Sequence, residues 1–190
     1  MKLVLATRNA HKVREMSALL AGHDVAPLPD EVDLPPEDGE TFAENALGKA
    51  RAAAAALGVP VIADDSGICV PALGGAPGIR SARWAGERAT DADNLEKLRD
   101  SAPAAAELEY VCVLAFVDPA ADVEETFEGR CRGLMADWPR GEGGFGYDPV
   151  FVPLDEHSGR TMAELTTREK DSISHRGRAA RLFLAWLASR

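Results

Sequence analysis

The sequence predicts an α/β or α+β fold built on a mixed β-sheet. In the first part of the chain, short apolar runs rich in β-branched residues alternate with stretches whose apolar residues recur at helical spacing, which is typical of strands that alternate with helices. Further on, residues 107–117 and 123–133 form two long strand-like runs joined by a short segment that contains a proline, which predicts a hairpin. Together the two patterns favour a sheet with both parallel and antiparallel strands.

The first elements are a strand, a helix, a strand and a second helix. Residues 2–6 are expected to form a buried strand, and a helix follows Asn9, a residue type that favours the N-cap. Another strand is expected at residues 24–28. Residues 41–44 match a capping box and open a helix that ends at Gly58. The apolar stripes of the two helices are Val13, Met16, Leu19 and Leu20 in the first, and Phe42, Ala46, Leu47, Ala50, Ala54 and Leu57 in the second.

The next stretch is the one around which the site is expected to form. Residues 61–63 predict a short buried strand that ends in the polar turn Asp64-Asp65-Ser66-Gly67, and residues 68–70 predict a short returning strand. Open α/β sheets bind ligands at the carboxyl ends of their strands. Two adjacent carboxylates repel each other, which favours a positive partner, most economically a divalent metal ion. A turn in which both aspartates only accept backbone amides is the alternative, and these residues alone leave both interpretations open.

The remaining elements complete the predicted fold. A helix is expected to begin at residues 90–93, a strand is expected at residues 150–152, and residues 161–164 match another capping box. Ser174 is a candidate N-cap for the last helix. The expected inner face of that helix consists of Ala179, Leu182, Phe183, Trp186 and Leu187.

Size and composition favour a single domain, residues 1–190, with 46% hydrophobic residues to form its core. No apolar run is long enough to span a membrane, and the start is too short for a signal peptide, so a cytoplasmic location is expected. The net charge of −10 argues against a nucleic-acid polymer as partner, although a local group of cations can still hold a nucleotide. Cys69, Cys112 and Cys131 are expected to be buried, reduced thiols.

The turn of residues 7–12, here called the anion turn, is a candidate phosphate site. The amides at a helix start, the helix dipole and the cation of Lys12 all favour a bound anion. The alternative is an ordinary capped helix with an exposed lysine. Asn45 and Lys49, near the start of the next helix, are candidates to point toward the same site, although the pattern favours a solvent-facing lysine.

The connection of residues 29–40 is rich in proline and in carboxylates. Acidic loops of this kind are usually solvated. One of these carboxylates is nevertheless a candidate to complete a metal shell begun by Asp65, because Mg²⁺ often takes only one or two protein carboxylates and fills its other positions with water and phosphates. The carboxylates considered are Glu31, Asp33, Glu37, Asp38 and Glu40.

The glycine-rich loop of residues 141–146 fits the spacing G-x-G-x-x-G, but the prolines on both sides exclude the strand and helix that a dinucleotide-binding turn requires. The loop presents Phe145, Tyr147 and Asp148, which suit a nucleobase because an aromatic ring can stack on it and a carboxylate can accept its ring N–H groups. The alternative is that both aromatic rings fill the core. The histidine and arginine at 175–176 oppose the dipole of the last helix, which points toward a role in binding an electron-rich group.

Six separated segments, in this order and spacing, closely resemble the inosine triphosphate pyrophosphatase family, enzymes that remove non-standard purine nucleoside triphosphates. The resemblance runs nearly from end to end of the chain. The segments are Thr7-Arg8-Asn9-Ala10-His11-Lys12, Thr41-Phe42-Ala43-Glu44-Asn45-Ala46, Ala63-Asp64-Asp65-Ser66-Gly67, Gly74-Gly75-Ala76-Pro77-Gly78, Gly144-Phe145-Gly146-Tyr147-Asp148-Pro149 and Ser174-His175-Arg176-Gly177.

The resemblance implies an α/β fold with a long central mixed sheet flanked by helices, two lobes with a cleft between them, and a homodimer. It implies Mg²⁺-dependent hydrolysis of ITP, dITP and XTP to the monophosphate and pyrophosphate. It makes Asp65 the proton acceptor and a metal ligand, with Glu37 as the second ligand and Glu40 as the alternative. The substrate-binding residues that it implies are Thr7, Arg8, Asn9, Ala10, His11, Lys12, Ser66, Phe145, Gly146, Tyr147, Asp148, Lys170, His175 and Arg176.

One departure from the family pattern is Arg8, because many relatives carry glycine at this position. The longer side chain is expected either to add a phosphate contact or to restrict close approach of the backbone to the substrate.

Two other functions are compatible with part of the pattern. A nucleotide-binding sensor without hydrolysis would use the same groups, and release of pyrophosphate distinguishes it from an enzyme. A serine hydrolase that uses Ser66 and His175 is disfavoured, because the sequence around the serine lacks the G-x-S-x-G elbow.

Overall fold

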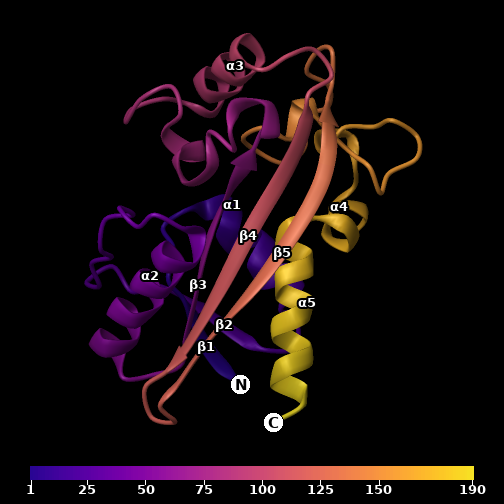
Figure 1. Ribbon diagram of the computed structural model, residues 1–190. Helices are drawn as coiled ribbons and strands as arrows, with labels where there is room; N and C mark the ends of the chain where they lie inside the picture. The colour runs from indigo at the N-terminus through magenta and orange to yellow at the C-terminus, as the bar shows by residue number, and fades with distance from the viewer. The chain divides into compact units, whose positions relative to one another are not determined.

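A computed structural model describes the whole chain, residues 1–190 (Figure 1). The helices are α1 (Ala10–Leu19), α2 (Phe42–Leu57), α3 (Asp91–Ser101), α4 (Thr167–Ile173) and α5 (His175–Ala188). The strands are β1 (Lys2–Leu5), β2 (Asp24–Pro27), β3 (Val61–Cys69), β4 (Glu107–Asp118), β5 (Val123–Met135) and β6 (Phe151–Pro153). Short 3₁₀ turns connect several of these elements.

The strands form one six-stranded sheet in the order β2-β1-β3-β4-β5-β6. Strand β1 pairs in parallel with both β2 and β3, whereas β5 and β6 pair antiparallel. The predicted mixed sheet of an α/β protein is therefore confirmed. The two long strands expected from the sequence, β4 and β5, are neighbours in this sheet.

The chain divides into two compact units. Unit 1 comprises residues 1–65, 112–129 and 176–190, and unit 2 comprises residues 66–111 and 130–175. The single domain and the cleft implied by the family resemblance both stay predictions.

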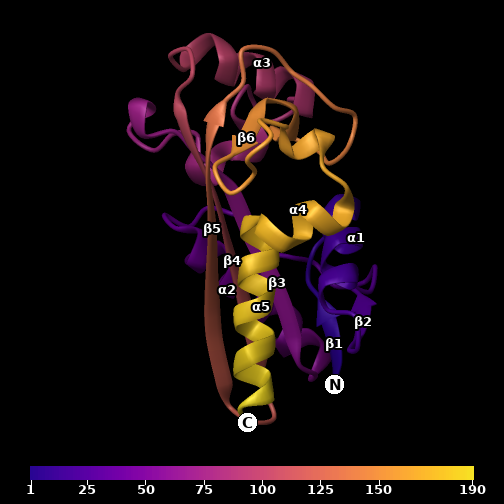
Figure 2. The same cartoon turned by 90° about the vertical axis from the view of Figure 1, so that its right-hand side faces the viewer.

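In unit 1, helices cover both faces of the sheet (Figures 1 and 2). The alanine-rich face of α2 packs on Val61 and Ala63, whereas Ile62 packs with side chains of α1 and α5 on the other face. This division follows from the alternation of side chains along a strand. By the same alternation, Asp64 belongs to the face of α1 and α5, and Asp65 to the face of α2.

Unit 2 has a core of its own, in which aromatic rings and aliphatic side chains pack together. Tyr110 of β4, Tyr147 and Phe151 lie in one cluster with Ile68 and Leu98. Tyr110 and Phe151 stack with 4.4 Å between ring centroids. The interior of this unit therefore lies next to the loop that the sequence assigned to a nucleobase.

The polar turn predicted at Asp64-Asp65-Ser66-Gly67 is wrong, because β3 continues without interruption from Val61 to Cys69. The sequence argument interpreted the change from apolar to polar residues as the end of the strand. In the strand the two carboxylates point to opposite faces, and cations described below neutralise Asp64. The separate strand expected at residues 68–70 is part of the same strand.

The predicted inner face of the last helix is partly wrong. Ala179 and Phe183 are fully buried, and Trp186 packs against them, but Leu182 is 50% exposed. Helix α4 was not expected from the sequence. The capping boxes predicted at Thr41 and Thr161 are both present, although the second begins only a short 3₁₀ turn, and the helix expected at residues 90–93 begins with a further capping box at Thr90.

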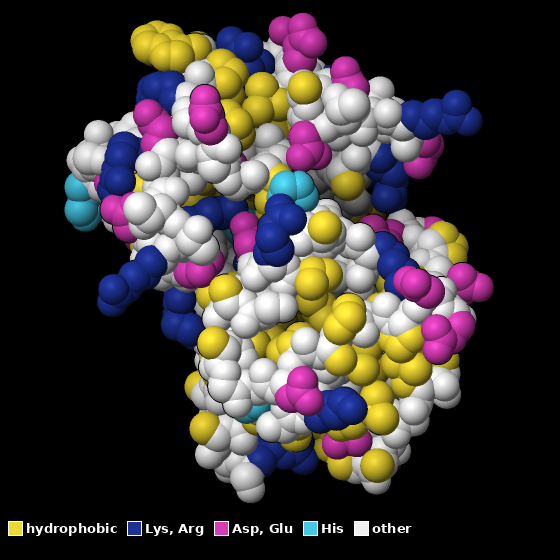
Figure 3. All heavy atoms as spheres, turned by 180° about the vertical axis from the view of Figure 1, so that it is seen from behind, with side chains coloured by type: hydrophobic (Ala, Val, Ile, Leu, Met, Phe, Trp, Pro, Cys, Tyr) yellow, Lys and Arg dark blue, Asp and Glu magenta, His cyan; other side chains and the backbone are white.

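Surface charge is mixed. On the face shown in Figure 3, Lys and Arg side chains are scattered among Asp and Glu and do not gather into one basic patch. None of the helices has the length and apolar character needed to cross a membrane. All three cysteines are free thiols; Cys112 and Cys131 are buried as expected, whereas Cys69 is partly exposed.

Candidate active site

Asp64 is a fully buried carboxylate of unit 1 that is surrounded by cations. Its Oδ2 atom accepts hydrogen bonds from Arg176 Nη2 at 3.1 Å and Nε at 3.3 Å, and it lies 3.2 Å from Lys12 Nζ. Its backbone oxygen accepts a hydrogen bond from Lys49 Nζ at 2.7 Å. Burial opposes ionisation of Asp64, but Lys12, Arg176 and Lys49 hold its pKa well below the usual range. Asp64 is therefore an ionised anchor for three cations.

The anion turn is a well-formed helix start. The side chain of Asn9 accepts the backbone N–H groups of His11 at 2.9 Å and Lys12 at 3.3 Å, which confirms the predicted N-cap. Lys12 is not the exposed lysine of the alternative interpretation, since only 13% of its side chain is accessible. Because Asn9 already engages two of the first amides of α1, a phosphate at this turn depends chiefly on the Lys12 ammonium.

Arg176 connects α5 to α1 through Asp64 and a second carboxylate. Its Nη1 atom donates to Glu15 Oε2 at 2.5 Å, and only 1% of Arg176 is exposed. Burial opposes the guanidinium charge, but Asp64 and Glu15 keep the pKa of Arg176 above its ordinary value. The cation that looked out of place at a helix start is thus neutralised by two carboxylates.

Asp65 lies on the opposite face of β3, toward α2. Its Oδ2 atom accepts a hydrogen bond from Asn45 Nδ2 at 2.9 Å, and the residue is 5% exposed. Burial raises the pKa of Asp65; Lys49 and Lys12 lower it, and the nearby charge of Glu37 raises it further. The balance leaves Asp65 a stronger proton acceptor than an ordinary aspartate.

Glu37 and Lys49 form an ion pair beside Asp65. Lys49 is buried, with 6% of its side chain accessible, so it points into the site and not to solvent. Burial lowers the pKa of Lys49, but Asp64, Glu37 and Asp65 together raise it above the ordinary value. Asp65 therefore lies under the influence of both a carboxylate, Glu37, and an ammonium group, Lys49.

The site can be tested for its fit to a divalent metal ion. Glu37 and Asp65 are hard oxygen donors, and the charge of Glu37 contributes to the raised pKa of Asp65, so a cation bound by both carboxylates would offset their repulsion. No group of three or more His, Cys, Asp or Glu side chains is placed to hold a metal ion alone. A Mg²⁺ ion held by these two carboxylates would share its remaining positions with water and phosphates, which suits this metal.

In unit 2, Asp148 organises the glycine loop. Its Oδ2 atom accepts hydrogen bonds from the Phe145 amide at 2.9 Å and from Lys170 Nζ at 2.7 Å, and Oδ1 accepts from the Tyr110 hydroxyl at 3.1 Å. Gly144 has a φ of +70°, and a Cβ atom there would overlap the Asp148 carboxylate, so the loop requires glycine. Asp148 is thus committed to holding the loop.

The aromatic residues of this loop have different places. Phe145 is half-buried, with the Lys170 ammonium 5.3 Å from its ring centroid. Tyr147 is 5% exposed, and its hydroxyl donates to the Ser81 backbone oxygen at 2.7 Å. The alternative interpretation therefore describes the packing of Tyr147, whereas Phe145 keeps an accessible ring.

His175 is buried next to this loop and is stacked on Tyr110, with 4.5 Å between ring centroids and 12° between ring planes. Tyr110 thus lies between His175 and Phe151, and its hydroxyl also binds Asp148. Tyr110 connects two of the residues that the sequence assigned to the base.

The predicted site residues fall into two groups. In unit 1 lie the anion turn, Glu37, Asp65 and Arg176; in unit 2 lie Ser66, Phe145 to Asp148, Lys170 and His175. Ser66 is half-buried, and the Gly146 amide donates to Asp91 at 2.9 Å. Asp64 and the two candidates Asn45 and Lys49 contact the group in unit 1. The sequence did not point to Glu15, which binds Arg176 in unit 1, or to Tyr110, which contacts Asp148 and His175 in unit 2.

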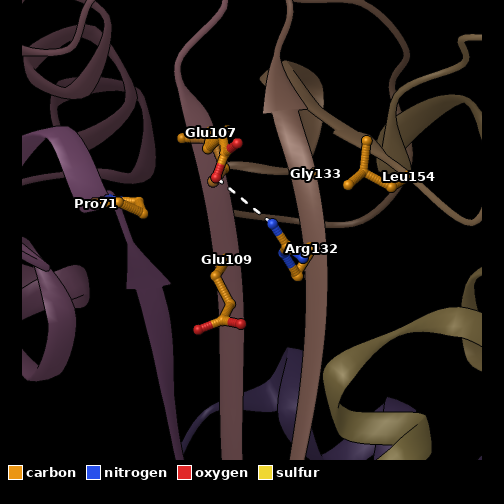
Figure 4. Close-up of a pocket in the computed structure, with 7 residues that line it drawn as sticks. Pro71, Glu107, Glu109, Arg132, Gly133 and Leu154 are labelled. Carbon is orange, nitrogen blue, oxygen red and sulfur yellow. Dashed lines mark ion pairs between the residues drawn. The ribbon is translucent and has the colours of Figure 1, made fainter.

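A separate cavity of about 130 Å³ lies in unit 2, away from these residues (Figure 4). It is lined by Pro71, Gly133 and Leu154 and by an ion pair between Glu107 and Arg132 at 3.6 Å. Glu107 neutralises the charge of Arg132, and none of the predicted site residues lines the cavity. It is not a candidate for the nucleotide site.

Fold and site together define the class: this is a mixed-sheet α/β protein in which two adjacent aspartates of β3, Asp64 and Asp65, lie close to lysine and arginine side chains. The chain belongs to the Ham1 family, whose sequence model matches residues 3–186. This confirms the resemblance drawn from the six segments.

Named relatives and solved structures agree. The chain is 49% identical to the dITP/XTP pyrophosphatase of Shigella flexneri, covering 96% of each chain, and 47% identical to that of Streptomyces avermitilis, covering 95% of this chain and 94% of the relative. The solved HAM1 protein of Coxiella burnetii is 38% identical, with a TM-score of 0.88 and complete coverage of both chains. The Ham1 protein of Staphylococcus aureus is also 38% identical, with a TM-score of 0.86 over 100% of this chain and 99% of the other. The prediction of a hydrolase is confirmed at the level of class, since both curated relatives are named pyrophosphatases.

Proposed function

We propose that this chain is a Mg²⁺-dependent pyrophosphatase that hydrolyses ITP, dITP and XTP to the monophosphate and pyrophosphate, and so removes non-standard purines from the nucleotide pool. The observation that carries the proposal is the pair of carboxylates, Glu37 and Asp65, flanked by the ammonium groups of Lys12 and Lys49 in one unit. Carboxylates suit a metal ion and ammonium groups suit phosphates. The names of the curated relatives support the choice of dITP and XTP.

In this mechanism Asp65 is the general base. It takes a proton from the water that attacks the α-phosphorus; a new P–O bond forms, and the bond to the β-phosphate oxygen breaks, so that pyrophosphate leaves. Its raised pKa strengthens it as an acceptor. Neutralisation of charge on the phosphate oxygens is the chemistry that Mg²⁺ supplies when it is bound by Glu37 and Asp65.

The lysines act by position and charge. Asp64 holds Lys12 by its carboxylate and Lys49 by its backbone oxygen, so both ammonium groups keep a defined place before substrate arrives. A preorganised cation stabilises the charge that develops on the leaving phosphate without a cost of reorganisation. Asp64 is therefore a positioning residue, whereas Asp65 is the catalytic one.

Base selection is assigned to unit 2. Phe145 offers a ring for stacking, and Lys170 and His175 offer polar atoms that suit a 6-oxo purine. A 6-amino group would leave such donors without an acceptor, which disfavours ATP. The resemblance assigned Arg176 to the base. Since its guanidinium binds Asp64 and Glu15, we assign it instead to positioning the start of α5.

The test is a panel of ITP, dITP, XTP, ATP and GTP, with and without Mg²⁺, followed by detection of pyrophosphate. We expect pyrophosphate from the first three only in the presence of the metal. Nucleotide binding without pyrophosphate would identify the sensor considered above, and would reject the enzyme. The homodimer, implied by the family resemblance, and the cytoplasmic location, expected from the sequence, stay predictions.

Tyr110→Leu is expected to raise the KM for dITP by about tenfold, because it removes the ring on which His175 stacks, and an aromatic pair contributes about 0.5–1.5 kcal/mol beyond its buried area. Tyr110→Phe keeps the ring and loses only one of the three hydrogen bonds to Asp148, so its KM should stay near that of the wild type. Steady-state kinetics of both variants, with their thermal stability measured alongside, tests this. Equal KM values for the two variants would contradict it.

A further inference from the structure

Arg8 makes an unusual set of contacts within unit 1. Its Nη1 atom donates to the backbone oxygen of Leu28 at 2.9 Å, and its Nη2 atom donates to those of Pro29 at 2.8 Å, Asp30 at 3.2 Å and Val32 at 2.9 Å. One side chain of the anion turn thus binds four carbonyl groups of another segment. The Asp30 carboxylate, 3.4 Å away, is fully exposed and adds little, since ion pairs in water contribute weakly.

These carbonyl groups belong to the acidic segment, residues 28–40, which joins β2 to α2. The segment forms neither helix nor strand, so its backbone groups need partners from elsewhere. A guanidinium group, with its planar set of donors, can satisfy several carbonyl groups at once, which a lysine ammonium cannot do in the same geometry. Leu28 and Val32 are buried, so the bound stretch is also packed against the core.

The other end of the acidic segment is fastened by α2. The Gly39 amide donates to Asn45 Oδ1 at 2.9 Å, and the same Asn45 side chain donates to Asp65. Between the two fastened ends lies Glu37, which is paired with Lys49. The position of Glu37 therefore depends on how firmly both ends are held.

We propose that Arg8 is a positioning residue that fastens the start of the acidic segment to the anion turn, and thereby fixes Glu37 beside Asp65 for a metal ion. The inference rests on the proposed function in one respect only, namely that Glu37 and Asp65 bind the metal ion. Of the two roles that the sequence left open, a phosphate contact is disfavoured, because both terminal nitrogens of Arg8 already donate to the acidic segment.

The experiment compares the full-length wild type with Arg8→Gln and Arg8→Lys. Amide hydrogen exchange over residues 28–40, measured without metal, should become about tenfold faster in both variants, because each loses hydrogen bonds from a charged donor. Mn²⁺ binding, followed by electron paramagnetic resonance, should weaken by about tenfold, the usual cost of losing a group that orients a metal ligand. The Mg²⁺ concentration for half-maximal activity should rise likewise, with kcat at saturating Mg²⁺ near that of the wild type.

Two control variants match these changes. Arg51→Gln removes another half-exposed arginine of unit 1, whose guanidinium binds Glu124, and should leave the acidic segment unchanged. Asp30→Asn removes the carboxylate near Arg8 and keeps the carbonyl groups, and it should also behave as the wild type.

Unchanged exchange over residues 28–40 in Arg8→Gln would overturn the proposal. So would faster exchange with unaltered Mn²⁺ affinity, because Arg8 would then hold the segment without positioning Glu37. A higher KM for nucleotide with neither change would assign Arg8 to phosphate instead. If the wild type binds Mn²⁺ but releases no pyrophosphate, the proposed function fails, and the exchange and Mn²⁺ measurements still decide the role of Arg8.

Discussion

Asp65→Asn is expected to lower the rate of pyrophosphate release by about 10²- to 10⁴-fold, the range that is typical when a general base is lost. The amide has nearly the shape of the carboxylate and its oxygen can still accept the hydrogen bond from Asn45. It cannot take a proton from water, and it is a weaker ligand for Mg²⁺. Steady-state assays with dITP over a range of Mg²⁺ concentrations measure the loss.

The fold should tolerate this change. The raised pKa of Asp65 means that the folded chain disfavours its ionised form, so removal of the charge should leave the free energy of unfolding unchanged or slightly higher. Asp38→Asn, an exposed carboxylate of the acidic segment, is the matched control and should keep full activity. Near wild-type turnover by Asp65→Asn would remove Asp65 from its catalytic role.

Local signals in the sequence predicted much of the fold. The side chains of Asn9, Thr41 and Thr90 bind the amides that a capping residue should bind, and the helices begin where these caps lie. The sheet was expected to be mixed, and it is. These features depend on residues close together in the chain, so the residue pattern contains them.

Contacts between distant parts of the chain were beyond such patterns. The sequence suggested that the strand ends at the two adjacent aspartates, because the apolar run gives way there to polar residues and a glycine, and it did not show which side chains would neutralise Asp64. The neutralising cations come from α1, α2 and α5, and with them β3 continues through both aspartates. Glu15 was missed for the same reason, since its partner Arg176 lies at the other end of the chain.

Tyr110 was missed because it occurs in a long apolar strand where an aromatic residue ordinarily serves the core. It does pack in the core of unit 2, and only its stacking on His175 and its hydrogen bond to Asp148 connect it with the base. For Arg8 the sequence showed a departure from the family but not its purpose. The carbonyl groups that Arg8 binds carry no signal in the residue types of the acidic segment.

Asp64→Asn, one residue before Asp65, should differ from Asp65→Asn by a large loss of stability. The wild-type carboxylate holds Lys12 and Arg176, and its loss would leave these cations close together in a buried place without their shared counterion. Removal of one partner from a buried ion pair costs about 3–5 kcal/mol. The free energy of unfolding at pH 7 should fall by about that amount, measured by urea denaturation.

Comparison of the two substitutions therefore distinguishes an effect on stability from an effect on catalysis. Asp64→Asn should lose both stability and activity, because Lys12 and Lys49 lose the group that positions them, whereas Asp65→Asn should lose activity alone. Both substitutions remove one negative charge from the same strand, so a difference between them cannot come from net charge. A loss of less than about 1 kcal/mol for Asp64→Asn, below the usual cost of breaking a buried ion pair, would contradict the role of Asp64 as the anchor of the cations.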